Sequence, residues 1–405
     1  MPALVEFGVP ATLALAALVL AVGRAVLSAV PLLQRHSIPA AVVGGLIAAA
    51  IAGALHVAGT DLAFARGLQP GMMLAFFATV GLGADLRMLA RGGSRLARFA
   101  LAVLLMLVAQ NAVGVLAARL LGLDPAIGLL AGSITMAGGH GTGAAWGAKF
   151  AESFGIQAAP AIAIAAATFG LVAGGLVGGP VARRLIERLA AQGRPLGASA
   201  AVSHPRDGAH GGGPMTADRL TLTLLLVAAC MVAGEWLGAR MAADAPVTLP
   251  PFVWTLLCGV VLRNLLAAAR VHEVDDRALD LAGQVSLGLF LAIALMGLRL
   301  WEVAALAGPV LVIVALQVLV VAALATFVTF RLVGGDYEAA VLVGGQCGFG
   351  LGATPTAMAN MQALTERFGH APSAFVVVPI MGAFLIDLMN ALVIGAFAAG
   401  LPALR

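Results

Sequence analysis

The sequence predicts an all-α polytopic membrane protein made of two inverted-topology repeats of about five transmembrane helices, each with a glycine-rich re-entrant segment. Three observations predict this class. The chain is 61% hydrophobic and only 10% charged, long apolar runs recur along its 405 residues, and the layout of these runs occurs twice. A soluble domain carries roughly 25% charged residues, and a helical span needs about 20 apolar ones. The composition therefore leaves no room for a separate soluble domain.

The apolar runs define the elements that we expect, in chain order. Those of the first half cover residues 4–23, 39–58, 70–86, 99–121, 126–148 and 160–182, and those of the second half cover 220–243, 250–269, 279–298, 304–330, 337–363 and 372–398. The intervening residues 183–219 are rich in Gly, Arg, His and Pro, which predicts a loop or disordered linker. We therefore expect an N-terminal repeat over 1–182, a cytoplasmic linker over 183–219 and a C-terminal repeat over 220–405.

Local sequence features also recur at a nearly constant separation of about 210 residues, which indicates an internal duplication. Ile38-Pro39 opens one apolar run as Leu249-Pro250 opens another, and Asp124 precedes a glycine-dense run as Asp336 precedes the second. With five spans per half and an N-terminus outside, most of the 23 Lys and Arg fall in cytoplasmic loops, as the positive-inside rule requires. An odd number of spans per half makes the second half inverted relative to the first.

The two glycine-dense runs are the expected re-entrant segments, over about 126–150 and about 337–363. Glycine lets the backbone turn where a regular membrane helix would not, and it leaves amide and carbonyl groups free to bind a ligand. In an inverted arrangement one tip enters from outside and the other from inside. Two such tips can meet near the midplane, where secondary transporters bind their substrates.

Hydroxyl, imidazole and glycine groups of the two tips are the candidate substrate ligands, because hydroxyls and half-helix amides near a helix start suit an anion. His140 has two open interpretations, a hydrogen bond to an anionic substrate or a structural role. The candidates are Ser133, Thr135, Gly139, His140, Gly141, Thr142, Gly350, Gly352, Thr354 and Thr356.

Asp387 is the most informative single residue, because an ionisable side chain inside an apolar span is costly without a partner. A sodium ion is one such partner, and a structural hydrogen bond to a neighbouring helix is the alternative. Asn390 lies on the same helix face, and Asn111 and Gln346 add amide oxygens from other segments, so these four residues are the candidate sodium ligands. The pair Gln110-Asn111 has a second open interpretation, hydrogen bonding between helices.

Several other classes of function find no support in the sequence. No zinc-protease or phosphate-loop motif occurs, and Ser133 with His140 forms no nucleophile elbow, so an intramembrane enzyme is a remote alternative. The three cysteines have no metal-ligand spacing, so we expect no cofactor and no metal other than the coupling ion. The net charge of +4 comes from residues at the ends of apolar runs, which argues against nucleic-acid binding.

The runs Ala131–Trp146 and Gly345–Gln362 resemble those of the glutamate:sodium symporter (ESS) family, and the resemblance extends to Pro70–Leu82, Ser286–Trp301 and Val378–Asn390. It implies sodium-coupled import of L-glutamate across the bacterial cytoplasmic (inner) membrane, with termini outside. It also implies a homodimer and an elevator-like movement of a substrate-carrying domain. A proton-coupled or passive carrier or channel for another small carboxylate or amino acid remains the alternative function.

Overall fold

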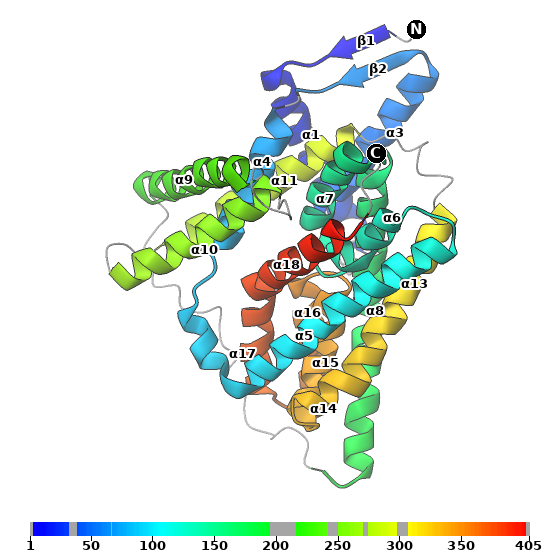
Figure 1. Ribbon diagram of the computed structural model, residues 1–405, viewed down its shortest axis with the longest axis vertical. Coiled ribbons are helices and arrows are strands. Elements are labelled where there is room, and N and C mark those ends of the chain that lie inside the picture. The colour runs from blue at the N-terminus through cyan, green and yellow to red at the C-terminus, as the bar shows by residue number, and fades with distance from the viewer. Residues whose placement is uncertain are drawn as a thin grey trace.

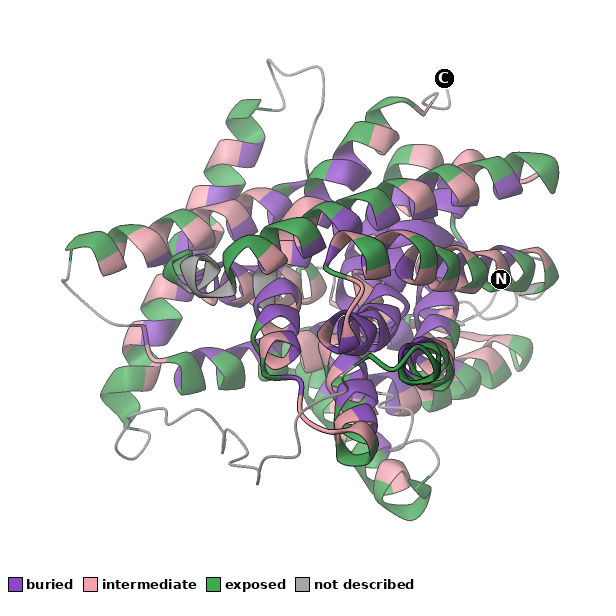
Figure 2. Cartoon of the chain, turned by 90° about the horizontal axis from the view of Figure 1, so that it is seen from below, coloured by how far each residue is buried: buried purple, intermediate pink, exposed green. Residues whose placement is uncertain are grey.

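The computed structural model describes residues 3–31, 39–65, 67–194, 216–241, 250–269, 274–297 and 307–401, with the side chains of 88–92, 307, 383 and 384 left aside. Helices make up nearly all of this part of the chain, and Figure 1 shows them crossing at many angles around a common centre. The buried residues in Figure 2 concentrate where the helices cross.

The helices follow the predicted order in both halves; η marks a π-helical turn. Those of the first half are α1 (Val9–Ala29), α3 (Ala40–Val57), α4 (Leu68–Leu82), α5 (Arg87–Leu120), α6 (Pro125–Leu129), η1 (Leu130–Ile134), α7 (Gly139–Phe154) and α8 (Ala159–Ala191). Those of the second half are α9 (Ala217–Met241), α10 (Pro251–Ala269), α11 (Asp276–Met296), α13 (Ala307–Leu324), η3 (Ala325–Thr329), α14 (Phe330–Leu332), α15 (Tyr337–Gly350), α16 (Thr354–Phe368), α17 (Pro372–Ile380), η4 (Met381–Leu385) and α18 (Ile386–Ala399).

Eight helices of the described chain are long and apolar enough to cross a membrane, which confirms the polytopic all-α class. Their outward faces carry large apolar side chains, such as Leu225 at 62% and Leu319 at 65% exposure. Exposed leucine side chains of this kind are unfavourable in water and favourable in the hydrocarbon of a membrane. The shorter helices α4, α6 with η1, and α18 are also apolar, and α17, η4 and α18 follow one another without a gap.

A two-stranded parallel sheet at one end of the molecule was not predicted. β1 (Ala3–Glu6) pairs with β2 (Thr60–Ala63), with Ala3 opposite Thr60. The first apolar run was expected to be helical from residue 4, but α1 begins only at Val9, where Pro10 occupies the first turn. The sheet ties the start of the chain to the connection between α3 and α4 (Figure 1).

The expected linker is also shorter than predicted, because α8 continues to Ala191 and α9 begins at Ala217. Leu185, Ile186 and Leu189 are buried along one side of this extension, and a helical stripe of that spacing packs on the body of the protein. The breakers that suggest a loop begin only beyond the end of α8. Residues 195–215 of the linker lie outside the described part of the chain.

The helices form two groups, and each half of the sequence contributes to both. The first group comprises α1, α3, α4, α9, α10 and α11, in which α4 packs most extensively against α10 and α11. Backbones approach closely there: a Cβ on Gly81 of α4 would lie 2.1 Å from the Leu256 carbonyl oxygen of α10. The second group comprises α5 to α8 and α13 to α18, centred on α8 and α15.

Helix α8 runs through the second group and contacts both glycine-rich segments in succession. Near its start, a Cβ on Gly147 of α7 would lie 2.9 Å from the Pro160 Cα atom. Toward its end, a Cβ on Gly178 would lie 2.8 Å from the Gly344 carbonyl oxygen of α15. Thus α7 lies along the first part of α8 and α15 along the second part.

Helices α15 and α16 form an antiparallel hairpin whose two ends lie together. A Cβ on Gly348 would lie 2.5 Å from the Ala357 Cα atom, and the Tyr337 hydroxyl, at the start of α15, donates to the Gly369 carbonyl, just past α16. The hairpin therefore leaves the protein centre on the same side from which it enters.

Candidate functional site

The first glycine-rich segment is broken near its middle. Asp124 caps α6, since its side chain accepts from the Ala126 amide. The helical path is interrupted within η1 at Gly132, whose φ of −90° and ψ of −141° are non-helical. Helix α7 starts at Gly139, whose φ of 64° is readily adopted only by glycine. Residues 132–139 are hereafter tip 1.

The second segment is broken in the same way, between the end of α15 at Gly350 and the start of α16 at Thr354. Asp336 caps α15 by accepting from the Ala339 amide, as Asp124 caps α6. Residues 350–354 are hereafter tip 2. The tips meet, because a Cβ on Gly139 would lie 3.3 Å from the Gly352 carbonyl oxygen.

Two adjacent amide side chains in the middle of α5 hold one tip each. The Gln110 Nε2 atom donates to the Gly350 carbonyl oxygen at 2.8 Å, and the Asn111 Oδ1 atom accepts from the Ser133 amide at 3.0 Å. Both side chains are fully buried. Each bond pairs a backbone group that the broken helices leave free, and such a group would otherwise be unsatisfied in an apolar interior.

The region from α17 to α18 holds the same two tips from another side. Asn390 of α18 donates from Nδ2 to the Ser133 carbonyl oxygen at 2.9 Å. The Thr354 hydroxyl of tip 2 donates to the Gly382 carbonyl oxygen in η4 at 3.0 Å. Both Asn390 and Thr354 were predicted as ligands. Their donors are used within the protein, whereas the Asn390 Oδ1 atom has no partner in the described chain.

Asp387 lies between these two attachment points, five residues after Gly382 and three before Asn390. Its carboxylate is half-buried and has no hydrogen bond or ion pair with any other residue that the structure describes. A helical turn separates it from Asn390, so both side chains lie on one face of α18. The neighbouring Asn390 Oδ1 and Ser133 Oγ atoms are buried and likewise have no partner.

His140, at the start of α7, is buried and lies 3.0 Å from the Thr168 hydroxyl of α8, measured from Nε2. That hydroxyl donates to the Ile164 carbonyl, so it can only accept from the histidine. The Nε2 atom therefore carries a proton, and in the neutral form of the imidazole Nδ1 is an acceptor. Thr168 is a residue that the sequence analysis missed, since one threonine in an apolar helix gives no signal.

Some of the predicted hydroxyl residues form hydrogen bonds within the protein, and others have no partner in the described chain. Thr135 donates to the Leu130 carbonyl at 2.6 Å, which stabilises the turn of tip 1. The hydroxyls of Ser133 and Thr356 are buried without a partner. Thr142 is buried in the first turn of α7, next to Gly141.

Gln346 lies at a different contact, where α5, α13 and α15 meet. Its Nε2 atom is 3.5 Å from the Met106 Sδ atom, and no described contact joins it to Asp387. Gln317 of α13 donates to the Gln110 carbonyl oxygen at the same junction. The sequence analysis missed Gln317, although a lone glutamine in an apolar helix is a usable signal.

The meeting of the tips has a defined electrostatic character. Helices α7 and α16 both begin there, and a helix start presents free amides and a positive dipole end. Asp387 adds a carboxylate without a cationic partner in the described chain. The centre therefore suits an anion at the helix starts together with a cation beside Asp387.

Comparison with known proteins gives a consistent result. The family model described as "Sodium/glutamate symporter" matches residues 5–370. A sodium/glutamate symporter of Haemophilus influenzae is 47% identical over 386 residues, which cover 94% of either chain. One of Escherichia coli is 48% identical over 386 residues, covering 95% of this chain and 96% of that protein, and one of Shigella flexneri matches equally well.

Replacing Asn111 with alanine should loosen tip 1. The Ser133 amide would lose its buried partner, at a cost of about 1–3 kcal/mol, so we expect about tenfold faster hydrogen exchange in peptides spanning tip 1. Gln317→Leu is the matched control, because it removes another buried amide that is bonded to α5. Equal exchange in tip 1 of both variants would contradict the role of Asn111.

Proposed function

Because the chain belongs to the sodium/glutamate symporter family, we propose that it imports L-glutamate across a bacterial inner membrane together with sodium. It is a transporter and not an enzyme, and Na⁺ is its coupling ion. The observation that carries the proposal is the meeting of two broken segments at a site with two helix starts and a carboxylate that no described residue pairs with.

Glutamate carries two carboxylates, and the starts of α7 and α16 offer two anion sites. In our proposal the amides at Gly139, Gly141 and Gly352, with nearby hydroxyls, hold these carboxylates. His140 assists through Nδ1, whose acceptor character suits the substrate ammonium group. Among the hydroxyls, Ser133, Thr142 and Thr356 remain ligand candidates, whereas Thr135 and Thr354 shape the tips.

Sodium binds beside Asp387 in this proposal. The Asp387 carboxylate, the Asn390 Oδ1 atom and the Ser133 Oγ atom have no partner among the described residues. The hydrogen bond between Asn390 and Ser133 keeps the last two near each other. Hard cations prefer such oxygens. Asn111 acts indirectly, since its oxygen accepts from Ser133, and Gln346 lies at another contact.

In this proposal the protein consists of two inverted repeats with re-entrant segments, and this arrangement gives the substrate site access to either face of the membrane. The hairpin of α15 and α16 and the position of α7 along the first part of α8 support tips that enter from opposite faces. Each half contributes to both helix groups, so the group with the tips can move as an elevator against a scaffold of α1, α3, α4, α9, α10 and α11. We expect the scaffold to dimerise, with both termini periplasmic.

Sodium orders the tips and raises the affinity for glutamate. A ligand shifts a conformational equilibrium only through different affinities for the two states. Asn390 contacts Ser133 in tip 1, so an ion bound beside Asn390 favours the ordered tip over a loosened one. The ordered, loaded centre is then the state that crosses the membrane.

The direct test is uptake of labelled L-glutamate by proteoliposomes that contain the purified protein. We expect accumulation with an inward sodium gradient and none when a potassium or proton gradient replaces it. Accumulation driven by protons alone would establish the proton-coupled alternative, and equilibration without accumulation would establish a passive carrier.

Asp387→Asn should remove sodium dependence while the protein still folds, since asparagine has nearly the same shape. We expect sodium-driven uptake to fall about tenfold or more, because the loss of about 1.4 kcal/mol of ion binding already gives that factor. Asp218→Asn, at an exposed carboxylate at the start of α9, is the matched control and should transport normally. Normal sodium activation in a folded Asp387→Asn protein would refute this site.

Single cysteines at exposed ends of the two segments should report opposite faces of the membrane. In intact cells an impermeant maleimide should label Ser153→Cys and not Glu366→Cys, which should react only after permeabilisation. The parent chain, with Cys230, Cys258 and Cys347, gives the background. Labelling of both variants in intact cells would exclude inverted re-entrant segments.

A further inference from the structure

The last turns of α8 are flanked on two sides by cavities whose lining includes arginine. Neither cavity touches the tips or Asp387. The first has a volume of about 480 Å³ and lies between α8 and α16, and the second has about 200 Å³ and lies between α8 and the region of η3 and α14.

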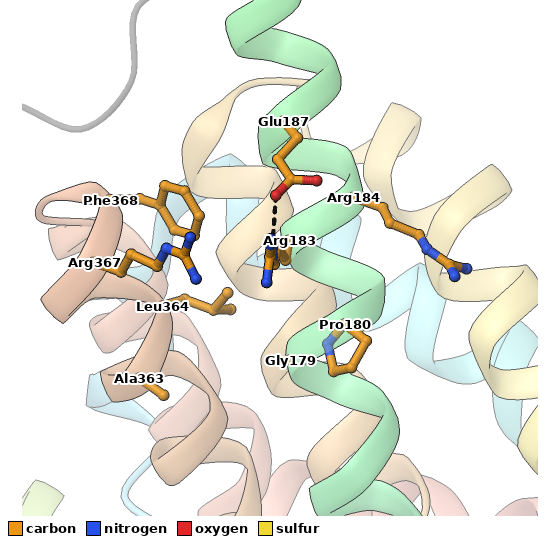
Figure 3. A pocket seen from close by; sticks show the side chains of 9 residues that line it. All are labelled: Gly179, Pro180, Arg183, Arg184, Glu187, Ala363, Leu364, Arg367 and Phe368. Carbon is orange, nitrogen blue, oxygen red and sulfur yellow. Dashed lines mark hydrogen bonds and ion pairs between the residues drawn. The ribbon is translucent and has the colours of Figure 1, made fainter.

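The first cavity combines an apolar floor with charged walls. Gly179 and Pro180 form part of α8's side, and Arg183 and Arg367 extend into the space between α8 and α16 (Figure 3). Arg183 donates from Nε to Glu187 at 2.6 Å, and the Arg367 guanidinium stacks over the Phe368 ring at 5.2 Å. Arg184 lies on the other side of α8 in the same view.

The second cavity has three arginines and no carboxylate among its lining residues. Arg188 lies in α8, Arg194 lies three residues beyond its end, and Arg331 lies in α14. Arg194 donates to the Gly335 carbonyl and Arg331 to the Phe327 carbonyl, which positions both guanidinium groups without neutralising them. Phe327, at 57% exposure, adds an apolar rim.

The charges of this region are not balanced within the described chain. Glu187 is the one carboxylate that lines either cavity, and it is paired with Arg183. The remaining guanidinium groups have no ion pair with a carboxylate that the structure describes. They belong to Arg184, Arg188, Arg194, Arg331 and Arg367.

The position along the helices indicates a membrane surface. From Ala159, α8 carries no charged residue until Arg183, and from Ala307 the chain carries none until Arg331. Both stretches exceed the roughly 20 residues that cross a hydrocarbon core. The arginines therefore lie at headgroup depth, with exposed apolar side chains such as Leu176, at 59% exposure, directly on the hydrocarbon side.

We propose that the arginine-lined end of α8 binds the phosphate headgroups of anionic phospholipids, with their acyl chains along the exposed apolar side chains below. Arginine suits a phosphodiester because its planar fork donates two parallel hydrogen bonds. Basic cavities between membrane helices at this depth are suited to such headgroups. A free phosphate carries the same charge but has no acyl chains to contact the apolar rim. The rim therefore favours a lipid as the ligand.

The test compares the full-length protein with the triple variant Arg184→Gln, Arg188→Gln and Arg367→Gln, which spares the arginines that hydrogen-bond within the protein. The control is Arg24→Gln, Arg119→Gln and Arg240→Gln, which removes the same charge from exposed arginines elsewhere. Native mass spectrometry counts bound phosphatidylglycerol, with phosphatidylcholine as the neutral lipid. Thermal unfolding in detergent compares phosphatidylglycerol with inorganic phosphate.

We expect phosphatidylglycerol to bind and stabilise the parent and the control, and its affinity for the triple variant to fall about tenfold or more. Phosphatidylcholine should bind far less well to all three proteins. Equal phosphatidylglycerol binding by the triple variant and the control, or equal binding of both lipids by the parent, would overturn the proposal. Full stabilisation by inorganic phosphate would also overturn it, in favour of a free-anion site.

Discussion

The structure depends on one constraint: backbone groups freed by a broken helix inside an apolar interior must find partners. Tip 1 exposes the amide and carbonyl of Ser133, and tip 2 exposes the carbonyl of Gly350. Asn111, Asn390 and Gln110 supply these partners. The relative positions of α5, α18 and the two tips follow from that requirement, because each bond fixes one helix against one break.

Since Gln110 and Asn111 are neighbours on one helix, the two tips share a single support. A change that moves this turn of α5 alters the hydrogen bonds of both tips at once. The contact between Gly139 and Gly352 couples them again. A ligand that orders one tip lowers the entropic cost of ordering the other, which is a physical basis for cooperative binding of an ion and an anionic substrate.

Much of this organisation could be predicted from the sequence, because hydropathy and glycine density are local signals. Such local signals predicted the helix order, the breaks near Gly132 and Gly352 and the position of Asp387 inside an apolar segment. Which partner each polar group finds is not local. The bond from the Asn390 Nδ2 atom to the Ser133 carbonyl could not be foreseen, nor could the contact of Gln346 with Met106. Hydrophobic spacing also did not reveal β1 or the extension of α8. A short strand carries a weak pattern, and in the extension the buried leucines and isoleucine alternate with arginines that suggest a loop.

The hydrogen bonds of the two tips have a consequence for the order of assembly. The Ser133 carbonyl pairs with Asn390, 257 residues later in the chain, and Gln110 pairs with Gly350, 240 residues later. During synthesis the first half therefore enters the bilayer before these partners exist. Until α18 has been made, the Ser133 carbonyl lacks the partner that it has in the full structure. The hydrogen bonding of the centre is therefore completed only after the second half has been synthesised.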